Sequence, residues 1–323
     1  MHYDVFNGDA DGICALHQLR MADPLESMLV TGVKRDIKLL QKLIEVSNST
    51  ITVLDISMDA NKRSLLELLK QKNAIQYFDH HFPGEVPIHS GLQSHIDTAP
   101  DVCTSVIVDR FLNGKYREWA IVAAFGDNLH KAAHELASSL SLSSVQIEQL
   151  CELGELINYN SYGPKIEDLH CPPTILYGSI SAYPVPWGFC EDSKTFLDLK
   201  TGYAQDMENV KSYSPIIDST AGSVYCFPAE PWSLRVAGVF SNSIARDQPE
   251  SAHALLVANG DGSYLVSVRS PLNNPTGADV LCREFATGGG RKAAAGINQL
   301  PDADVEKFFE RFESVFTNDP DVK

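Results

Sequence analysis

The sequence carries little positive charge for its length of 323 residues. It contains 26 lysine and arginine residues against 42 aspartate and glutamate residues, so its formal net charge is -16 at pH 7. Proteins that hold long nucleic acids depend on basic side chains that neutralise many phosphates. The composition therefore predicts no binding of long polymers, whereas a short anionic substrate needs only a local basic cluster.

Two other patterns are absent. The seven cysteines include no Cys-x-x-Cys pair, which excludes the common zinc-ribbon and dithiol motifs. No apolar run approaches the roughly 18 residues of a membrane helix, and the first residues do not resemble a secretory signal. We expect reduced thiols, a cytoplasmic location and no membrane partner, and the sequence leaves a monomer and a homodimer open.

Residues 1–80 alternate β-rich runs with helix-like segments, which is typical of βαβ units and a parallel sheet. Strands are expected at residues 3–6, 28–33, 50–54 and 74–78, and helices at residues 12–20, 37–46 and 59–71, the last with Asp59 as its N-cap. Further helices are expected at residues 102–112, 118–125, 131–140 and 145–159, whereas the proline-rich segment 172–189 favours loops.

The pattern changes after residue 204. A polar segment is expected to be helical over residues 205–214, strands are expected at 224–227, 233–240, 254–258 and 264–268, and a helix at 303–316. Asn259-Gly260-Asp261-Gly262 is a strong hairpin signal. The sequence thus predicts a parallel-sheet α/β domain with additional helices over residues 1–204, a linker over 205–222, and a smaller α/β domain over 223–323.

Acidic residues and histidines follow the expected strands of the first domain. They are Asp9, Asp11, Asp55, Asp79, His80, His81 and, after an apolar run, Asp127. The carboxyl ends of parallel strands meet at one edge of a sheet, so we expect these side chains to converge. Each of them taken alone is compatible with a helix cap or a turn.

Convergent carboxylates require cations. Two of them about 4 Å apart repel by about 4 kcal/mol at an effective dielectric constant near 20. Oxygen ligands with one or two imidazoles suit Mn²⁺ or Mg²⁺, whereas the oxygen-rich set disfavours iron and zinc. Two such ions would activate a water and clamp a phosphoryl oxygen, so the cluster predicts phosphoester hydrolysis.

A glycine-rich segment near the end of the chain forms a second candidate site. Gly288, Gly289 and Gly290 precede Arg291 and an alanine-rich run that is expected to begin a helix. Backbone N–H groups in such a loop form an anion-binding nest, and Arg269 could contact the same anion with both arms of its guanidinium group. A flexible hinge and a surface charge are the alternative interpretations.

The ordered motifs resemble those of the DHH phosphoesterases. Residues 7–12 (Asn-Gly-Asp-Ala-Asp-Gly), Asp55, Asp79-His80-His81 and Gly126-Asp127 are similar to the four motifs of that family, and residues 267–270 and 288–296 resemble its DHHA1 substrate domain. The resemblance implies a two-domain hydrolase with a pair of Mn²⁺ ions in the first domain and nucleotide recognition by the second.

The resemblance also implies roles for individual residues. The metal ligands would be Asp9, Asp11, Asp55 as a bridge, His80 and Asp127. Asp79 would orient a histidine, and His81 would lie near the scissile phosphate or complete the metal shell. The substrate would be held by Arg269, Ser270, Gly288, Gly289, Gly290 and Arg291.

Three positions depart from the family pattern. Val5 stands where members that degrade very short RNA carry a histidine, and Asn7 stands where exonuclease-like members carry an aspartate, which predicts that one metal is held more weakly. Arg291 stands where the tail motif carries a histidine. Arginine can donate two hydrogen bonds to the O6 and N7 atoms of guanine, which favours a guanine-containing substrate such as pGpG.

These features predict a Mn²⁺-dependent phosphodiesterase that hydrolyses short linear oligonucleotides, especially diribonucleotides, to 5′-mononucleotides. The alternatives are a single-strand-specific exonuclease on longer DNA or RNA, a phosphatase of cyclic dinucleotides or 3′-phosphoadenosine 5′-phosphate, and an inorganic pyrophosphatase. A nucleotide-binding regulator with a degenerate metal site is the alternative without catalysis.

Overall fold

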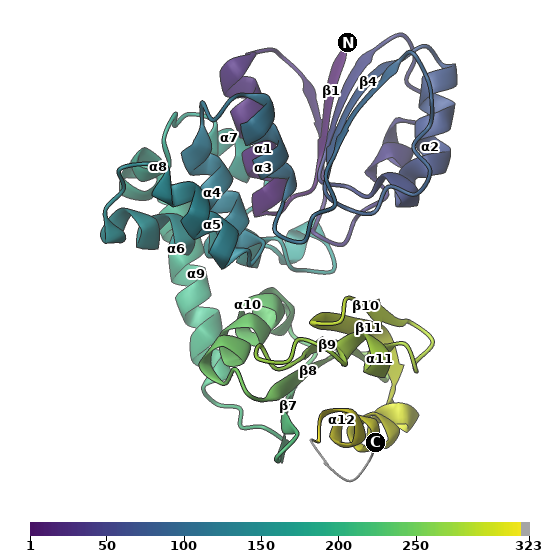
Figure 1. Cartoon of the computed structure of the whole chain (residues 1–323), viewed down its shortest axis with the longest axis vertical. Helices are drawn as coiled ribbons and strands as arrows, with labels where there is room; N and C mark the ends of the chain where they lie inside the picture. The colour runs from purple at the N-terminus through teal and green to yellow at the C-terminus, as the bar shows by residue number, and fades with distance from the viewer. Residues whose placement is uncertain (318–323) are drawn as a thin grey trace. The chain divides into compact units, whose positions relative to one another are not determined.

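The computed structural model describes residues 1–317 and divides into two compact units (Figure 1). The first runs from Met1 to Gly202, and the second begins at Tyr203. Within residues 1–317, no helix combines the length and the apolar character that crossing a membrane requires. The mixed α/β fold predicted from the sequence is confirmed, with a parallel sheet in the first unit and a separate sheet in the second.

The first unit is built on a parallel sheet in the order β2-β1-β3-β4-β5. Its strands are β1 (His2–Phe6), β2 (Met28–Val30), β3 (Thr50–Leu54), β4 (Ala74–Asp79) and β5 (Leu92–Ile96). The four expected strands are confirmed, although β2 is shorter than expected. The edge strand β5 was missed because its residues are mostly half-buried or exposed and carry little apolar signal.

Helices cover both faces of this sheet (Figure 1). On one side lie α1 (Ala10–Ala22) and α3 (Thr104–Phe111), and on the other α2 (Met58–Lys70). Leu65, Leu68 and Leu69 of α2 are buried in a core with the sheet, as their helical spacing predicts. The N-cap of α2 is Ser57, whose side chain accepts a hydrogen bond from the backbone of Ala60, and Asp59 lies in the first turn instead.

The remaining elements of the unit are helical. They are η1 (Leu39–Leu43), α4 (Arg117–Gly126), α5 (His130–Ser138), α6 (Ser144–Asn160), η2 (Ile166–Asp168), α7 (Pro173–Ile180), α8 (Pro186–Asp192) and the first half of α9 (Lys194–Val210), whose second half belongs to the second unit. The helix expected at 37–46 is only the 3₁₀ segment η1. The expectation of loops over 172–189 was wrong, because Pro173 and Pro186 begin α7 and α8 in their first turns, where proline costs no hydrogen bond.

The buried side chain of His17 should make the protein less stable in mild acid. Its ring stands edge-on to Trp119, with the ring centroids 4.6 Å apart, and its Nε2 lies 2.9 Å from the carbonyl oxygen of Tyr183. Burial lowers the pKa of His17 to about 4, although that carbonyl partly offsets the effect. Histidine in the unfolded chain has a pKa of about 6.5, so the unfolded state binds the extra proton first as the pH falls.

We expect the free energy of unfolding to fall by up to about 3 kcal/mol between pH 6.5 and pH 4 on account of this residue. Urea denaturation across that range measures the effect. In a His17→Phe variant this part of the pH dependence should be absent. If the free energy of unfolding changed with pH equally in both proteins, His17 would not be its cause.

The second unit has its own sheet in the order β10-β11-β9-β8-β7-β6. Its strands are β6 (Ile217–Asp218), β7 (Gly222–Phe227), β8 (Ala252–Ala258), β9 (Ser263–Arg269), β10 (Gly288–Gly290) and β11 (Ala294–Pro301). The predicted hairpin is confirmed, since β8 and β9 pair antiparallel around residues 259–262. Of the expected linker 205–222, residues 205–210 end α9 and residues 217–218 form β6.

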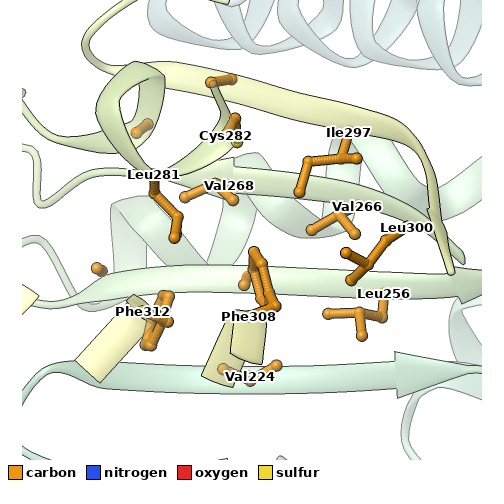
Figure 2. Packing of buried hydrophobic residues seen from close by; sticks show 14 of the residues in the cluster. Val224, Leu256, Val266, Val268, Leu281, Cys282, Ile297, Leu300, Phe308 and Phe312 are labelled. Atoms are coloured by element: carbon orange, nitrogen blue, oxygen red, sulfur yellow. The ribbon is translucent and has the colours of Figure 1, made fainter. Parts of the chain in front are cut away.

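Helices lie on both faces of this sheet. They are α10 (Pro231–Asp247), α11 (Ala278–Cys282), η3 (Asp302–Asp304) and α12 (Val305–Phe316). Figure 2 shows Phe308 and Phe312 of α12 packed over Val224, Val266 and Val268 of the sheet. This amphipathic helix is the one that the sequence predicts at residues 303–316.

Two expectations for the second unit were wrong. Residues 233–240, expected as a strand, lie within α10, where Trp232, Val236, Val239 and Phe240 are buried at helical spacing. The alanine-rich run after Arg291, expected to begin a helix, forms strand β11. Alanine is the best helix former, but its advantage over ordinary residues is at most about 0.7 kcal/mol per residue, and pairing with β9 and β10 outweighs it.

Candidate metal centre

The acidic residues of the first unit converge at the carboxyl edge of its sheet. Asp9 follows β1, Asp55 follows β3, and Asp127 follows α4. Among residues 1–317, two groups of three side chains have ligand atoms within 4.8 Å of one another. They are Asp11 with His80 and Asp127, and Asp55 with His80 and His81. Carboxylate oxygens with an imidazole nitrogen are a donor set that fits a hard divalent cation.

His80 is oriented for metal binding. Its Nδ1 lies 2.9 Å from the carbonyl oxygen of Val102. A carbonyl can only accept a hydrogen bond, so Nδ1 carries a proton, and in the neutral ring Nε2 then has the lone pair that a metal needs. Nε2 lies 3.5 Å from Asp55 Oδ1 and 3.9 Å from Asp127 Oδ2. A histidine whose other nitrogen is held in this way is a typical metal ligand.

Asp55 adopts a left-handed backbone conformation with φ of 58° directly after β3. Its N–H donates to the carbonyl oxygen of Phe78, and its Oδ1 accepts a hydrogen bond of 3.2 Å from Thr104 Oγ1. Burial, and then the charges of Asp11 and Asp9, raise the pKa of Asp55 well above its usual range. A divalent cation at this position would remove that penalty by stabilising the carboxylate.

Asp11 joins the first turn of α1 to the start of α3. Its two carboxylate oxygens accept hydrogen bonds from the backbone N–H groups of Thr104, at 2.7 Å, and Ser105, at 2.6 Å. Each oxygen keeps a second lone pair for a metal. Burial raises the pKa of Asp11 even though the neighbouring His80 lowers it, so this carboxylate too would be stabilised by a cation.

Asp79 orients the His81 ring and belongs to neither of the two groups of candidate metal ligands. Its Oδ1 lies 2.7 Å from His81 Nδ1, and its Oδ2 accepts from the backbone N–H of Met58 at the start of α2. Asp79 is fully buried, whereas the His81 side chain is 43% exposed. Burial alone would lower the pKa of His81, but the hydrogen bond to Asp79 raises it above its usual value.

The sequence analysis missed Lys34. Its Nζ lies 2.5 Å from Asp9 Oδ2, 2.9 Å from Asn158 Oδ1 and 3.5 Å from Asp127 Oδ1. Burial would lower the pKa of Lys34, but the Asp9 charge and hydrogen bond raise it well above its ordinary value. The position directly after the expected strand 28–33 is the same signal that singled out the aspartates, and it would have identified this residue.

The expected substrate residues lie in the second unit. Arg269 ends β9, and its Nε donates to Asn242 Oδ1 at 2.9 Å. Ser270 is buried, and its Oγ donates to the carbonyl of Lys292 while accepting from the N–H of Ala278. Gly288, Gly289 and Gly290 form β10, and Arg291 is exposed beside it. Their role in substrate binding stays a prediction.

The three glycines of β10 differ in whether the backbone requires glycine at their position. A Cβ on Gly288 would collide with the carbonyl oxygen of Cys282, and Gly290 has a φ of 139° that other residues rarely adopt. Gly289 has no such neighbour within 4 Å. Two of the three positions therefore require glycine for the backbone itself, independently of any ligand.

No protein-family model matches the sequence, and no curated protein matches it. Solved structures do match. The manganese complex of RecJ from Thermus thermophilus covers 99% of this chain with a TM-score of 0.58 at 17% identity, although the chain spans only 52% of that RecJ. Another manganese-bound RecJ exonuclease covers 99% of this chain and is itself covered to 91%, with a TM-score of 0.53 at 17% identity.

The pGpG-specific phosphodiesterase PggH from Vibrio cholerae also matches. It covers 97% of this chain, is itself covered to 99%, and has a TM-score of 0.55 at 11% identity. These similarities show that the chain has the RecJ-like DHH fold, as the sequence motifs predict.

Proposed function

We propose that this chain, which has the RecJ-like DHH fold, is a metal-dependent phosphodiesterase that hydrolyses short linear oligonucleotides to 5′-mononucleotides. The observation that carries the proposal is the convergence of Asp11, His80 and Asp127 with the buried Asp55 at one sheet edge. Mn²⁺ suits this mixed oxygen and nitrogen donor set best, with Mg²⁺ as the alternative. The RecJ structures that share the fold contain Mn²⁺.

Different residues of the centre would bind the metal and donate the proton. A bound divalent ion would supply an activated water and neutralise a phosphoryl oxygen. Asp11, Asp55, Asp127 and Nε2 of His80 would hold that ion in place. The His81 ring is fixed through Nδ1 by Asp79, which leaves its Nε2 to donate a proton to the leaving oxygen of the substrate. The buried Asp79 carboxylate, which lies 2.7 Å from Nδ1, favours the protonated ring that this step needs.

We further propose that diribonucleotides, pGpG above all, are the preferred substrates. The net charge of -16 disfavours long polymers, since each phosphate added to the substrate meets an acidic protein. Arg291, with Arg269, offers planar guanidinium groups suited to a guanine edge or a terminal phosphate. PggH, a pGpG-specific phosphodiesterase, matches this chain over nearly the full length of both proteins.

Product analysis tests the proposal. Metal-stripped protein is supplied with Mn²⁺ and with 5′-labelled RNA of two to about twenty nucleotides, alongside cyclic dinucleotides and pyrophosphate. We expect pGpG to be consumed fastest, with mononucleotide products and persistence of the longer chains. Equal shortening of all lengths would instead indicate a general exonuclease, and cleavage of none would support a nucleotide-binding regulator. An Asp55→Asn protein serves as the inactive control.

A further inference from the structure

Lys34 is anchored by its backbone as well as by its side chain. It lies in the loop between β2 and η1, where its N–H donates to the carbonyl oxygen of Ser161 at 3.0 Å. Its own carbonyl oxygen accepts a hydrogen bond of 3.3 Å from Asn7 Nδ2. These contacts join the loop to residues that follow α6 and β1, so the position of Lys34 does not depend on its ion pair alone.

The ammonium group of Lys34 is surrounded by oxygen atoms of the centre. Nζ donates hydrogen bonds to Asp9 Oδ2 and Asn158 Oδ1, and it forms an ion pair with Asp127 Oδ1 at 3.5 Å. The Tyr162 ring lies 5.6 Å from Nζ and adds a favourable contact with the cation. The side chain is only 23% exposed. A fixed positive charge therefore lies in the cluster where the fold places its acidic residues.

Asp9 is engaged by N–H donors on both carboxylate oxygens. Oδ1 accepts from the backbone N–H groups of Asp11 and Gly12 at the start of α1, and Oδ2 accepts from Lys34. Asp9 belongs to neither of the two ligand groups found among residues 1–317. Val5, on the adjoining strand, is a fully buried hydrophobic residue and offers no ligand atom.

Asp127 lies between this lysine and the candidate metal ligands. Its Oδ1 is 3.5 Å from Lys34 Nζ, and its Oδ2 is 3.9 Å from His80 Nε2. The Asp127 carboxylate thus lies between the ammonium group of Lys34 and the imidazole ring of His80.

We propose that the Lys34 ammonium group takes the place of one of the two divalent ions expected from the sequence, so that the centre binds a single divalent ion through Asp11, Asp55, His80 and Asp127. The inference rests on the metal dependence in the proposed function. One divalent ion and one lysine together carry three positive charges, which offset three of the four negative charges of Asp9, Asp11, Asp55 and Asp127.

Metal counting on the full-length chain tests the inference without any substrate. Stripped protein is saturated with Mn²⁺, separated from free metal and analysed for bound manganese, with electron paramagnetic resonance on the same samples. We expect one ion per wild-type chain, with the spectrum of an isolated Mn²⁺. In a Lys34→Met variant the freed Asp9 and Asp127 should recruit a second ion, and the spectrum should show coupling between two ions.

A matched variant controls for the loss of a nearby lysine, Lys42, which lies in η1. Its ion-pair partner is Asp36, at 2.7 Å, which is not one of the residues of the acidic cluster. A Lys42→Met protein should therefore still bind one ion. Two coupled ions in the wild-type chain would overturn the inference, as would a folded Lys34→Met protein that still binds one. If that variant does not fold, the wild-type stoichiometry decides alone.

The same measurements separate this inference from the proposed function. One bound ion without hydrolysis of any oligonucleotide would reject the proposed function and leave the role of Lys34 standing. No bound Mn²⁺ at all would reject both.

Discussion

We expect the hydrolytic rate of an Asp55→Asn protein to fall about 10²- to 10³-fold, and we expect this protein to be more stable than the wild type in the absence of metal. The loss has the size seen when one group that stabilises transition-state charge is removed. Asparagine tolerates the left-handed conformation found at this position, so the backbone is not disturbed. The gain in stability comes from removing a buried charge among like charges.

The size of this gain in stability depends on pH. Burial and the charges of Asp11 and Asp9 raise the pKa of Asp55 in the folded protein, whereas the unfolded carboxyl titrates near 3.9. The unfolded state therefore releases its proton first as the pH rises, and stability is lost from about pH 4 up to the folded pKa. We expect the midpoint of thermal unfolding in EDTA to be about 5 °C higher for the variant at pH 7, with no difference near pH 3.5.

Thermal unfolding with EDTA and with Mn²⁺ measures both consequences. Mn²⁺ should raise the midpoint of the wild type but not that of Asp55→Asn, so the order of stability reverses. The exposed Asp101 supplies the matched control, since Asp101→Asn should behave as the wild type. Equal midpoints of Asp55→Asn and wild type in EDTA at pH 7 would contradict the assignment of Asp55 as a carboxylate strained by like charges.

A Gly154→Ala substitution should destabilise the first unit by about 2 kcal/mol or more, even though alanine is the better helix former. Gly154 lies in α6 against α4, and a Cβ there would overlap the carbonyl oxygen of Val122 and lie 2.8 Å from the backbone nitrogen of Gly126. Both neighbours are backbone atoms, so relief requires the two helices to separate. Because Asp127 follows α4 directly, the affinity for Mn²⁺ should fall as well.

Gly178 provides the control for this prediction. It is also in a helix, α7, but a Cβ there meets no atom within 4 Å. Gly178→Ala should therefore be neutral or stabilise by about 0.5–1 kcal/mol through helix propensity alone. Urea denaturation gives both free energies, and a Gly154→Ala protein as stable as Gly178→Ala would show that α4 and α6 are not in close backbone contact.

The parts of the fold that the sequence predicts well have a local cause. In β3, Ile51, Val53 and Leu54 are all fully buried, so the strand is an apolar run that needs no partner to be recognised. Leu65, Leu68 and Leu69 of α2 show the helical period of a surface helix in the same local way. The aspartates were found because the end of a strand is itself a local feature.

The parts that the sequence misses depend on neighbours. The alanine-rich run of β11 has the composition of a helix start, and only its pairing with β9 and β10 makes it a strand. Residues 233–240 are β-branched and aromatic enough to suggest a strand, but the burial of Trp232 and Val236 one helical turn apart decides for α10. Propensity differences of about 1 kcal/mol per residue or less are outweighed by such packing.

By itself, the sequence determined the α/β class, the ordered motifs, and the set of aspartates and histidines that a parallel sheet brings to one edge. Which side chains meet there was decided only by the tertiary structure. Lys34 contacts Asn158 across 124 positions of the chain, and Asp11 receives its hydrogen bonds from residues more than 90 positions away. The end of a strand can be predicted from the local pattern of hydrophobic residues. The partner of a buried charge depends instead on which distant backbone and side-chain groups the folded chain places beside it.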